Sequence, residues 1–411
     1  MRVPLVRRSR GLSRGCSATS TSSCSLVVSA ATRGSSIEGL NNLTVSVLHI
    51  VSKWGNGGVE RYIESLIRCD DSSKFEMSVA SVHTTVDSSV AECRFGPLAN
   101  AKSGIGGDAR SVERLVARLN PDIIHIHTNN GTGFDYARAS NGLLHRVCIV
   151  HSHNASFDKR LRMAKRVYTN ISRSLNLRYV THAWACSHEA GTHLFGNAHF
   201  DVKKNGVDTQ RFAYSMKTRS AVRRELGIAD DSFVLGFAAR LTEVKNPLFA
   251  FEIFKEMARR RPRVYFIVVG DGPLMSALES VVAATGFENT CFLLGYQESP
   301  ERYYSAMDVL IAPSLHEGLP INLVEAQANG LAILASDSIT DEVILRGASY
   351  EKRSLSEQPA KWCDGIESLV GGSVVSRPKA WKDVANLGYE VADTARDVFA
   401  SYEKAVQPVG D

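Results

Sequence analysis

Residues 309–329 read VLIAPSLHEGLPINLVEAQAN, and this stretch indicates the fold more clearly than any other part of the chain. The apolar run 309–312 predicts a buried strand, and the residues from Ile321 onward have the spacing of a helix. Gly318 lets the backbone approach a ligand closely, and Pro320 suits the first helical position because an N–H group would be unpaired there. A strand, a glycine-containing loop and a helix in this order are typical of an α/β fold.

The same stretch predicts a binding site that combines two kinds of chemistry. The unpaired N–H groups and the dipole of a helix N-terminus favour an anion such as a diphosphate. Glu317 and Glu325 would repel that anion, but their carboxylates can accept hydrogen bonds from hydroxyl groups. An anion flanked by two hydroxyl-rich groups describes a nucleotide sugar. The alternative interpretation is a surface loop and an amphipathic helix that carry two unrelated acids.

The rest of the chain alternates short β-branched runs with helical stretches. Its 411 residues fit two domains of roughly 150 to 200 residues each. Such alternation implies βαβ units and parallel sheets, so we predict two facing doubly wound domains with a ligand cleft at the carboxyl ends of their strands. The predicted strands are 45–51, 76–82, 123–127, 147–150 and 182–186, then 233–238, 264–269, 290–294, 309–312 and 332–335, with early helices near 60–67, 110–119 and 134–144.

The chain divides into four predicted segments. Residues 45–204 form an N-terminal domain, residues 205–390 a C-terminal ligand-binding domain, and residues 391–411 a helix that packs back on the N-terminal domain. Residues 1–44 carry six arginines and ten serines before position 37, with no acid until Glu38, which predicts a disordered segment. We interpret it as a start codon assigned too early, with translation beginning near residues 43–47. A mitochondrial or chloroplast transit peptide has a similar composition and is the alternative.

The overall composition narrows the class of protein. A hydrophobic content of 44% and 22% charged residues are ordinary for a soluble globular protein. No apolar run reaches the ~18 residues that a transmembrane helix needs. The eight cysteines are scattered without a C-x-x-C pair, which predicts reduced thiols in a cytoplasm and neither a disulfide framework nor a cysteine zinc site.

Two more loops at predicted strand ends carry candidate site residues. Arg240 and Lys245 flank a strand end and the following helix start. The planar guanidinium group of an arginine and the flexible ammonium group of a lysine suit the two phosphates of a diphosphate. Solvated surface charges are the alternative. His151 and His153 could indicate a metal, but the sequence offers no third and fourth ligand at a useful spacing, so we predict no metal site. A structural histidine pair is equally compatible with the spacing.

The segment 306–343, AMDVLIAPSLHEGLPINLVEAQANGLAILASDSITDEV, resembles the donor-site signature of retaining GT-B glycosyltransferases of family 4. The likeness is strongest to the branch that builds bacterial capsular and exopolysaccharides. It implies that Glu317 contacts the donor sugar, that Glu325 holds the ribose hydroxyls, and that the loop of Gly318, Leu319 and Pro320 binds the donor. It also implies a GT-B fold, with no metal or other cofactor.

Other strand-end loops fit the same resemblance. It implies that Arg240 and Lys245 neutralise the leaving diphosphate and that His153, with His151 as the fallback, reaches the transferred sugar. The family has a glycine where this chain has Ala239, a mild departure beside Arg240. The remaining donor-binding residues that the resemblance implies are Gly57, Gly58, Gly270 and Gly272.

The sequence says less about the acceptor than about the donor. Residues 158–178 carry many Lys and Arg and a single acid, interleaved with apolar residues, which describes either a solvated helix face or a contact with anionic lipid. No nucleic-acid-binding motif accompanies this charge, so we predict no nucleic-acid partner. The resemblance implies a polyprenyl-diphosphate-linked saccharide as acceptor and an enzyme on the inner face of the plasma membrane.

The expected function is therefore the retaining transfer of a hexose or N-acetylhexosamine, with a UDP-linked sugar as the expected donor, in exopolysaccharide or capsule assembly. Two alternatives share the fold. A nucleotide-sugar 2-epimerase would release nucleotide and an epimerised sugar without an acceptor. A catalytically silent subunit would dock on a partner glycosyltransferase, although the presence of Glu317, Glu325, Arg240 and Lys245 argues against it.

Overall fold

The computed structural model describes residues 44–52, 54–55, 57–70, 74–82, 94–97, 107–141, 147–154, 162–371 and 377–407. The predicted N-terminal extension lies outside these residues, apart from Thr44. Lys159 and Arg160 of the basic segment 158–178 also lie outside the described residues. Among the described residues, no helix is both long enough and apolar enough to cross a bilayer.

The N-terminal half is built on a parallel sheet of seven strands in the order β3-β2-β1-β4-β5-β6-β7. The chain leaves β1 toward one edge and then returns to fill the other, which is the doubly wound arrangement. The strands are β1 (Val45–Val51), β2 (Phe75–Ser81), β3 (Arg94–Pro97), β4 (Ile123–Thr128), β5 (Val147–Ser152), β6 (His182–Ala185) and β7 (Asp201–Val202). The helices are α1 (Gly58–Cys69), α2 (Gly107–Leu119), α3 (Thr132–Asn141), α4 (Arg162–Asn176) and α5 (His188–Phe195).

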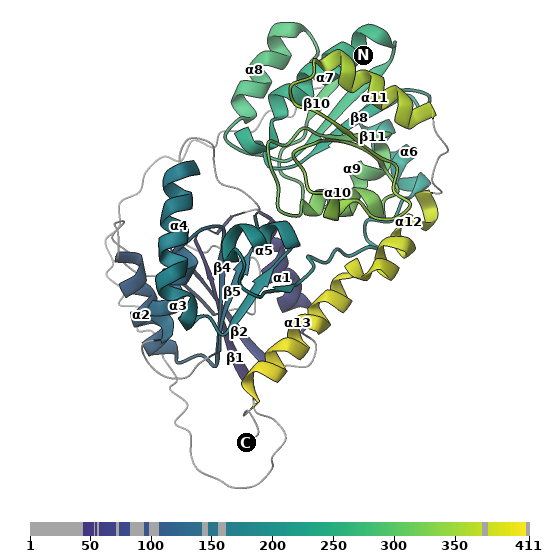
Figure 1. Ribbon diagram of the computed structural model, residues 1–411. Coiled ribbons are helices and arrows are strands. Elements are labelled where there is room, and N and C mark those ends of the chain that lie inside the picture. Colours follow the sequence, from purple (N-terminus) through teal and green to yellow (C-terminus); the bar gives the residue numbers. More distant parts are fainter. Residues whose placement is uncertain are drawn as a thin grey trace, which may run out of the picture. The chain divides into compact units, whose positions relative to one another are not determined.

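Helices cover both faces of this sheet, which explains why its strands read as nearly continuous apolar runs. On one face Leu48 and Ile50 of β1 pack among buried residues of α2, α3 and α5. On the other face Val47 and Val51 pack among residues of α1 and of the last helix of the chain, α13 (Val391–Val406). Figure 1 shows α2 and α3 on the first side and α13 on the other.

The C-terminal half holds a second parallel sheet of six strands in the order β10-β9-β8-β11-β12-β13. Alternate residues of β8 face opposite cores, with Val234 in one and Leu235 and Phe237 in the other. The strands are β8 (Phe233–Ala238), β9 (Val264–Val269), β10 (Cys291–Leu293), β11 (Val309–Ala312), β12 (Ala332–Ser336) and β13 (Tyr350–Arg353). The helices are α6 (Met216–Glu225), α7 (Pro247–Arg260), α8 (Met275–Thr285), α9 (Glu301–Ala306), α10 (Ile321–Ala328), α11 (Pro359–Gly371) and α12 (Arg377–Val384).

The chain passes between the two halves twice, and the two passages are hydrogen-bonded to each other. The Val207 N–H donates to the Tyr389 carbonyl at 2.8 Å, and the Val391 N–H donates to the Val207 carbonyl at 2.9 Å. After the second passage α13 lies on the N-terminal sheet, where Ala395, Val398 and Tyr402 are buried. Helix α13 thus joins the core of the N-terminal half although it follows the C-terminal half in sequence.

The predicted α/β fold is confirmed, and every predicted strand is present within about two residues of its expected ends. Three strands were missed: β3, β7 and β13. All three are short and lie at or next to a sheet edge, and β7 and β13 contain few apolar residues, so no hydrophobic run marked them.

Candidate functional site

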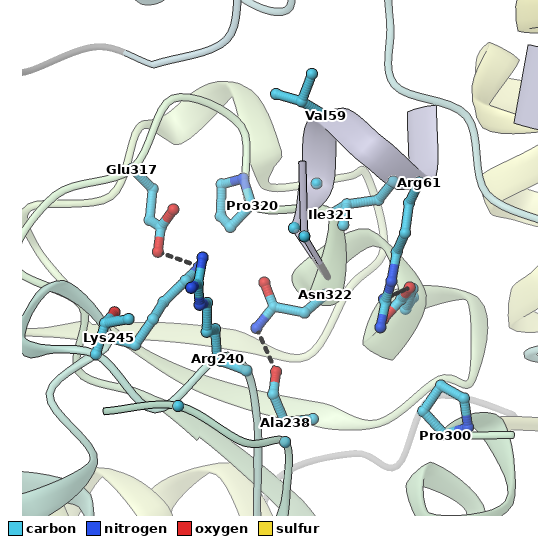
Figure 2. A pocket seen from close by; sticks show the side chains of 18 of the residues that line it. Val59, Arg61, Ala238, Arg240, Lys245, Pro300, Glu317, Pro320, Ile321 and Asn322 are labelled. Atoms are coloured by element: carbon cyan, nitrogen blue, oxygen red, sulfur yellow. Dashed lines mark hydrogen bonds and ion pairs between the residues drawn. The ribbon is translucent and has the colours of Figure 1, made fainter. Parts of the chain in front are cut away.

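One cavity of roughly 810 Å³ gathers side chains from both halves. It opens beside the carboxyl ends of β5, β8, β9 and β11 and the N-termini of α1 and α10. Figure 2 shows Arg240 and Lys245 pointing toward Glu317, with Arg61 entering from α1. The cavity is lined by all twelve candidate residues from the sequence: Gly57, Gly58, His153, Arg240, Lys245, Gly270, Gly272, Glu317, Gly318, Leu319, Pro320 and Glu325.

The loop between β11 and α10 comes close to the N-terminal half at Gly318. A Cβ atom at this position would lie 2.6 Å from the His153 carbonyl oxygen and 2.9 Å from the Asn154 Cα atom. Because both neighbours are backbone atoms, no larger residue fits without moving one of the two backbone segments. Pro320 occupies the N-cap of α10, with a ψ of 108°, and not the first helical position that the sequence predicted. Ile321 and Asn322 of the first turn line the cavity, and the Leu323 N–H donates to the Pro320 carbonyl at 3.0 Å.

Glu325 is the fifth residue of α10 and is buried, with 4% of its surface exposed. Its carboxylate accepts from Arg61 Nη1 at 3.1 Å and from the Tyr304 hydroxyl at 2.8 Å. Burial raises the pKa of Glu325, while Arg61 and Tyr304 lower it. The carboxylate therefore has two partners in place, and a ligand hydroxyl must share it with them or displace Arg61, which is half exposed in the cavity.

The other end of the cavity carries the two predicted cations. Lys245 forms an ion pair with Glu317, and Arg240 is exposed at the end of β8. Next to them the Asn322 side chain donates to the Ala238 carbonyl at 2.9 Å, which ties the first turn of α10 to the end of β8. This hydrogen bond fixes the helix N-terminus near the cations. An anion placed there would meet both positive charges and the helix N-terminus together.

Gly270 shapes the floor of the cavity after β9. Its φ of +133° lies in a region that L-residues rarely adopt, and a Cβ atom there would lie 2.0 Å from the Ala239 carbonyl oxygen. The residue therefore has to be glycine for two independent reasons. The departure at Ala239, where the family has glycine, leaves this contact between the two loops intact.

His153, which is half-buried, forms a group with the buried His49, His125, His127 and His151, here called the histidine cluster. They lie on one face of three adjacent strands, beneath α1 and α13, because alternate residues of a strand share a face. Ring nitrogens of His49 and His127 are 3.0 Å apart, and those of His127 and His153 are 2.9 Å apart. A second row joins the Tyr402 hydroxyl to His125 at 2.6 Å and His125 to His151 at 3.1 Å.

Burial keeps these imidazoles neutral. It lowers the pKa of His49 and of His153 to about 3, and it lowers the pKa of His125, His127 and His151 well below the ordinary value, with neighbouring histidines adding to the effect. His153 alone in the cluster lines the cavity. It can therefore offer a neutral imidazole to a bound sugar, as a donor or as an acceptor depending on its tautomer.

The premise that His151 and His153 lack further ligands is wrong. The sheet brings His49, His125 and His127 beside them, and two sets of three imidazoles lie close enough to hold a metal ion: His49 with His125 and His127, and His127 with His151 and His153. Neutral imidazole is a common transition-metal ligand. In the structure these rings hydrogen-bond one another, and the absence of a metal site stays a prediction.

Sequence comparisons agree with this geometry. Residues 56–211 match the model of Glycosyltransferase Family 4, and residues 218–361 match that of the Glycosyl transferases group 1. The chain is 31% identical to EpsF of Bacillus subtilis, a glycosyltransferase by name, over 85% of this chain and 94% of EpsF. The chain belongs to glycosyltransferase family 4. The resemblance found in segment 306–343 is thereby confirmed.

A second relative and a solved structure extend the comparison for this family 4 glycosyltransferase. The UDP-Gal:alpha-D-GlcNAc-diphosphoundecaprenol alpha-1,3-galactosyltransferase of Escherichia coli is 28% identical over 55% of this chain and 60% of that enzyme. The Anabaena protein HepE, solved with UDP and glucose, superposes with a TM-score of 0.71 at 18% identity, over 88% of this chain and all of HepE. This likeness confirms the GT-B fold.

The sequence did not reveal two residues that complete the cavity around Glu325. Arg61 stands three positions after Gly58, so its place after a glycine loop that opens a helix was a usable signal. Tyr304 lies in α9, two residues before segment 306–343, and the fold brings its hydroxyl to Glu325 of α10. Nothing in the local sequence around Tyr304 predicts that contact.

Proposed function

We propose that the enzyme transfers a hexose or N-acetylhexosamine from a UDP-linked donor, with retention of configuration, to a lipid-linked saccharide in exopolysaccharide or capsule assembly. The observation that supports this most is that one cavity holds two cations at a helix N-terminus and, opposite them, a buried carboxylate. A diphosphate fits the first set and ribose hydroxyls fit the second. UDP and a sugar are also what HepE holds in a structure of the same fold.

In the proposed reaction the protein acts through charge and position. The acceptor oxygen forms its bond to the anomeric carbon on the same face from which the diphosphate oxygen departs, and that diphosphate oxygen takes the acceptor's proton. Arg240, Lys245 and the N-terminus of α10 stabilise the charge that grows on the diphosphate. Glu317 and His153 hold the transferred sugar in position. No protein nucleophile and no cofactor enter the proposal.

The acceptor side of the proposal rests on the relatives. The E. coli enzyme is named for an acceptor that carries a sugar on diphosphoundecaprenol, and EpsF aligns with most of this chain. A polyprenyl chain resides in a bilayer, so an enzyme that uses such an acceptor has to work at the membrane surface. We accordingly propose that the enzyme associates peripherally with the inner face of the plasma membrane.

Nucleotide binding tests the donor half of the proposal. We expect UDP to bind the wild type, and Glu325→Ala to weaken that binding by about 1 to 3 kcal/mol because the ribose hydroxyls lose their acceptor. Isothermal titration calorimetry with UDP, GDP and ADP measures both effects. Glu288→Ala, an exposed acid away from the cavity, is the matched control and should bind as the wild type does.

Glu325 also anchors Arg61 and Tyr304, so each variant is first checked for an unchanged melting temperature. Glu325→Gln keeps the volume of the side chain and serves if the alanine variant is unstable. Equal UDP affinity in a folded Glu325 variant and in the wild type would mean that this carboxylate does not hold ribose.

A further inference from the structure

Helix α4 exposes a row of apolar side chains. Met163, Val167, Ile171 and Leu175 are 76%, 54%, 55% and 63% exposed. Their spacing of four residues places them along one side of the helix, where they form a continuous strip. Single exposed apolar residues are normal on a protein surface, but four in register over a helix of 15 residues are not. These four residues are called the α4 strip below.

The opposite side of α4 is polar and faces the protein. Thr169, Ser172 and Asn176 are buried. Thr169 accepts from the Gly131 N–H at 3.0 Å, and Ser172 and Asn176 donate to Asp135 of α3 at 2.7 and 2.9 Å. Helix α4 is therefore inverted: polar groups hold it on the protein and apolar groups face outward. Figure 1 places α4 beside α3, in the layer that covers the first sheet.

The charged side chains of α4 itself have one sign. The sequence of α4, RMAKRVYTNISRSLN, contains four cations and no acid. Arg166 is exposed beside Met163 and Val167 along the helix, and Lys165 and Arg173 are half exposed. An apolar strip bordered by cations matches the interface of an anionic bilayer, with acyl chains below and phosphate groups at the level of the cations. A neutral or basic protein surface would not complement these charges.

We propose that α4 lies in the plane of an anionic bilayer with Met163, Val167, Ile171 and Leu175 inserted among the acyl chains. This inference rests on the proposed function and deepens it. It specifies which surface of the enzyme contacts the membrane and so brings the cavity to a lipid-linked acceptor. It differs from attraction by basic residues alone. Lys165 and Arg166 guide α4 to the membrane, and the α4 strip retains it there when salt screens the charges.

Vesicle sedimentation of the full chain tests the proposal. The test variant replaces all four strip residues by glutamine, a good helix former, and should bind vesicles of phosphatidylglycerol and phosphatidylcholine at least about tenfold more weakly than the wild type. A control variant carries Leu119→Gln, Met216→Gln and Val370→Gln, three apolar residues that are 46%, 64% and 40% exposed on other helices. It should bind as the wild type does.

A charge variant, Lys165→Gln with Arg166→Gln, separates insertion from attraction. It should bind more weakly than the wild type at 0.1 M salt but change little up to 0.5 M, because the remaining strip is not screened, whereas the strip variant should lose its residual binding over that range, since the Debye length is only about 10 Å at 0.1 M. Release of UDP from soluble UDP-sugars in the presence of a polyprenyl-diphosphate-linked saccharide is measured in parallel. A wild type that binds vesicles but consumes no donor would refute the proposed function and leave the inference about α4 standing.

Equal vesicle binding by the strip variant and the wild type would overturn the proposal. So would a wild type that does not bind vesicles but forms a concentration-dependent dimer that the strip variant lacks, because the strip would then cover a second copy of the chain. Circular dichroism of the strip variant confirms that α4 remains folded.

Discussion

Arg240→Ala and Lys245→Ala are each expected to lower turnover about a hundredfold while the protein stays folded. Both side chains line the cavity at the end where the first turn of α10 is fixed by the hydrogen bond between Asn322 and Ala238. Charge grows on the diphosphate as its bond to the sugar breaks, and removal of one preorganised donor to such charge costs about 10² to 10³ in rate. The loss should appear in kcat more than in KM, because the interaction strengthens in the transition state.

Two comparisons make this result specific. Arg259→Ala and Lys361→Ala remove exposed cations from the same half of the protein and should leave kcat unchanged. Because Lys245 is paired with Glu317, Lys245→Ala also leaves that carboxylate without its partner. The double variant Lys245→Ala with Glu317→Gln removes the uncompensated charge, and its kcat should be lower than that of Glu317→Gln alone, which removes only the contact with the sugar. Wild-type turnover in either single variant would remove the diphosphate role from that residue.

Acidification from pH 7.5 to pH 5.5 is expected to lower the free energy of unfolding by several kcal/mol. The folded pKa values of the five cluster histidines lie well below the ordinary value of about 6.5. Below pH 6.5 these histidines are therefore protonated in the unfolded chain but stay neutral in the folded chain. The stability they contribute is present above pH 6.5 and is lost as the pH falls through it. One unit below, each such histidine costs about 1.4 kcal/mol.

The groups that face the cluster do not offset this loss. Burial raises the pKa of Tyr62 and Tyr402, so neither hydroxyl titrates in this range, and the Lys203 cation disfavours a charged His151. Glu60 and Glu325 act in the opposite sense, because burial raises their pKa and the folded state then takes up protons more readily. Two carboxyls oppose five imidazoles, and the net effect remains destabilising in acid.

Urea unfolding at pH 7.5, 6.5 and 5.5 measures this dependence. His49→Leu removes one titrating group and should reduce the slope of stability against pH by about one proton, whatever it does to stability itself. Val370→Gln, which changes an exposed residue that does not titrate, should leave the slope as it is. A stability that is flat between pH 7.5 and 5.5 would show that the cluster is not neutral and buried in solution.

The sequence predicts most of the cavity because its motifs are local. Glycine loops and helix starts at strand ends specify where the backbone turns, and parallel strands bring their carboxyl ends to one edge. Gly318, Arg240 and Glu325 could therefore be placed together without a structure. The contacts that escaped prediction join residues distant in sequence: Arg61 with Glu325, and His49 with His127. Strand order and the approach of the two halves determine these contacts, and neither leaves a local signal.

Helix α4 shows a different limit of prediction. The sequence indicates an amphipathic basic helix, and amphipathic helices ordinarily bury their apolar side. Only the contacts of Ser172 and Asn176 with Asp135 show that the polar side is buried instead. The orientation of an amphipathic helix depends on the surface it meets, so composition alone could not decide between a solvated face and a membrane contact.

The most direct test of the central claim is transfer of a labelled sugar from a panel of UDP-sugars to a polyprenyl-diphosphate-linked saccharide, with the anomeric configuration of the product read by NMR. The account predicts that one donor yields an elongated lipid-linked product with an α linkage, matching the α configuration of the donor, and that Lys245→Ala with Arg240→Ala abolishes it. An inverted linkage would contradict the account, as would release of free UDP with an epimerised sugar in the absence of any acceptor.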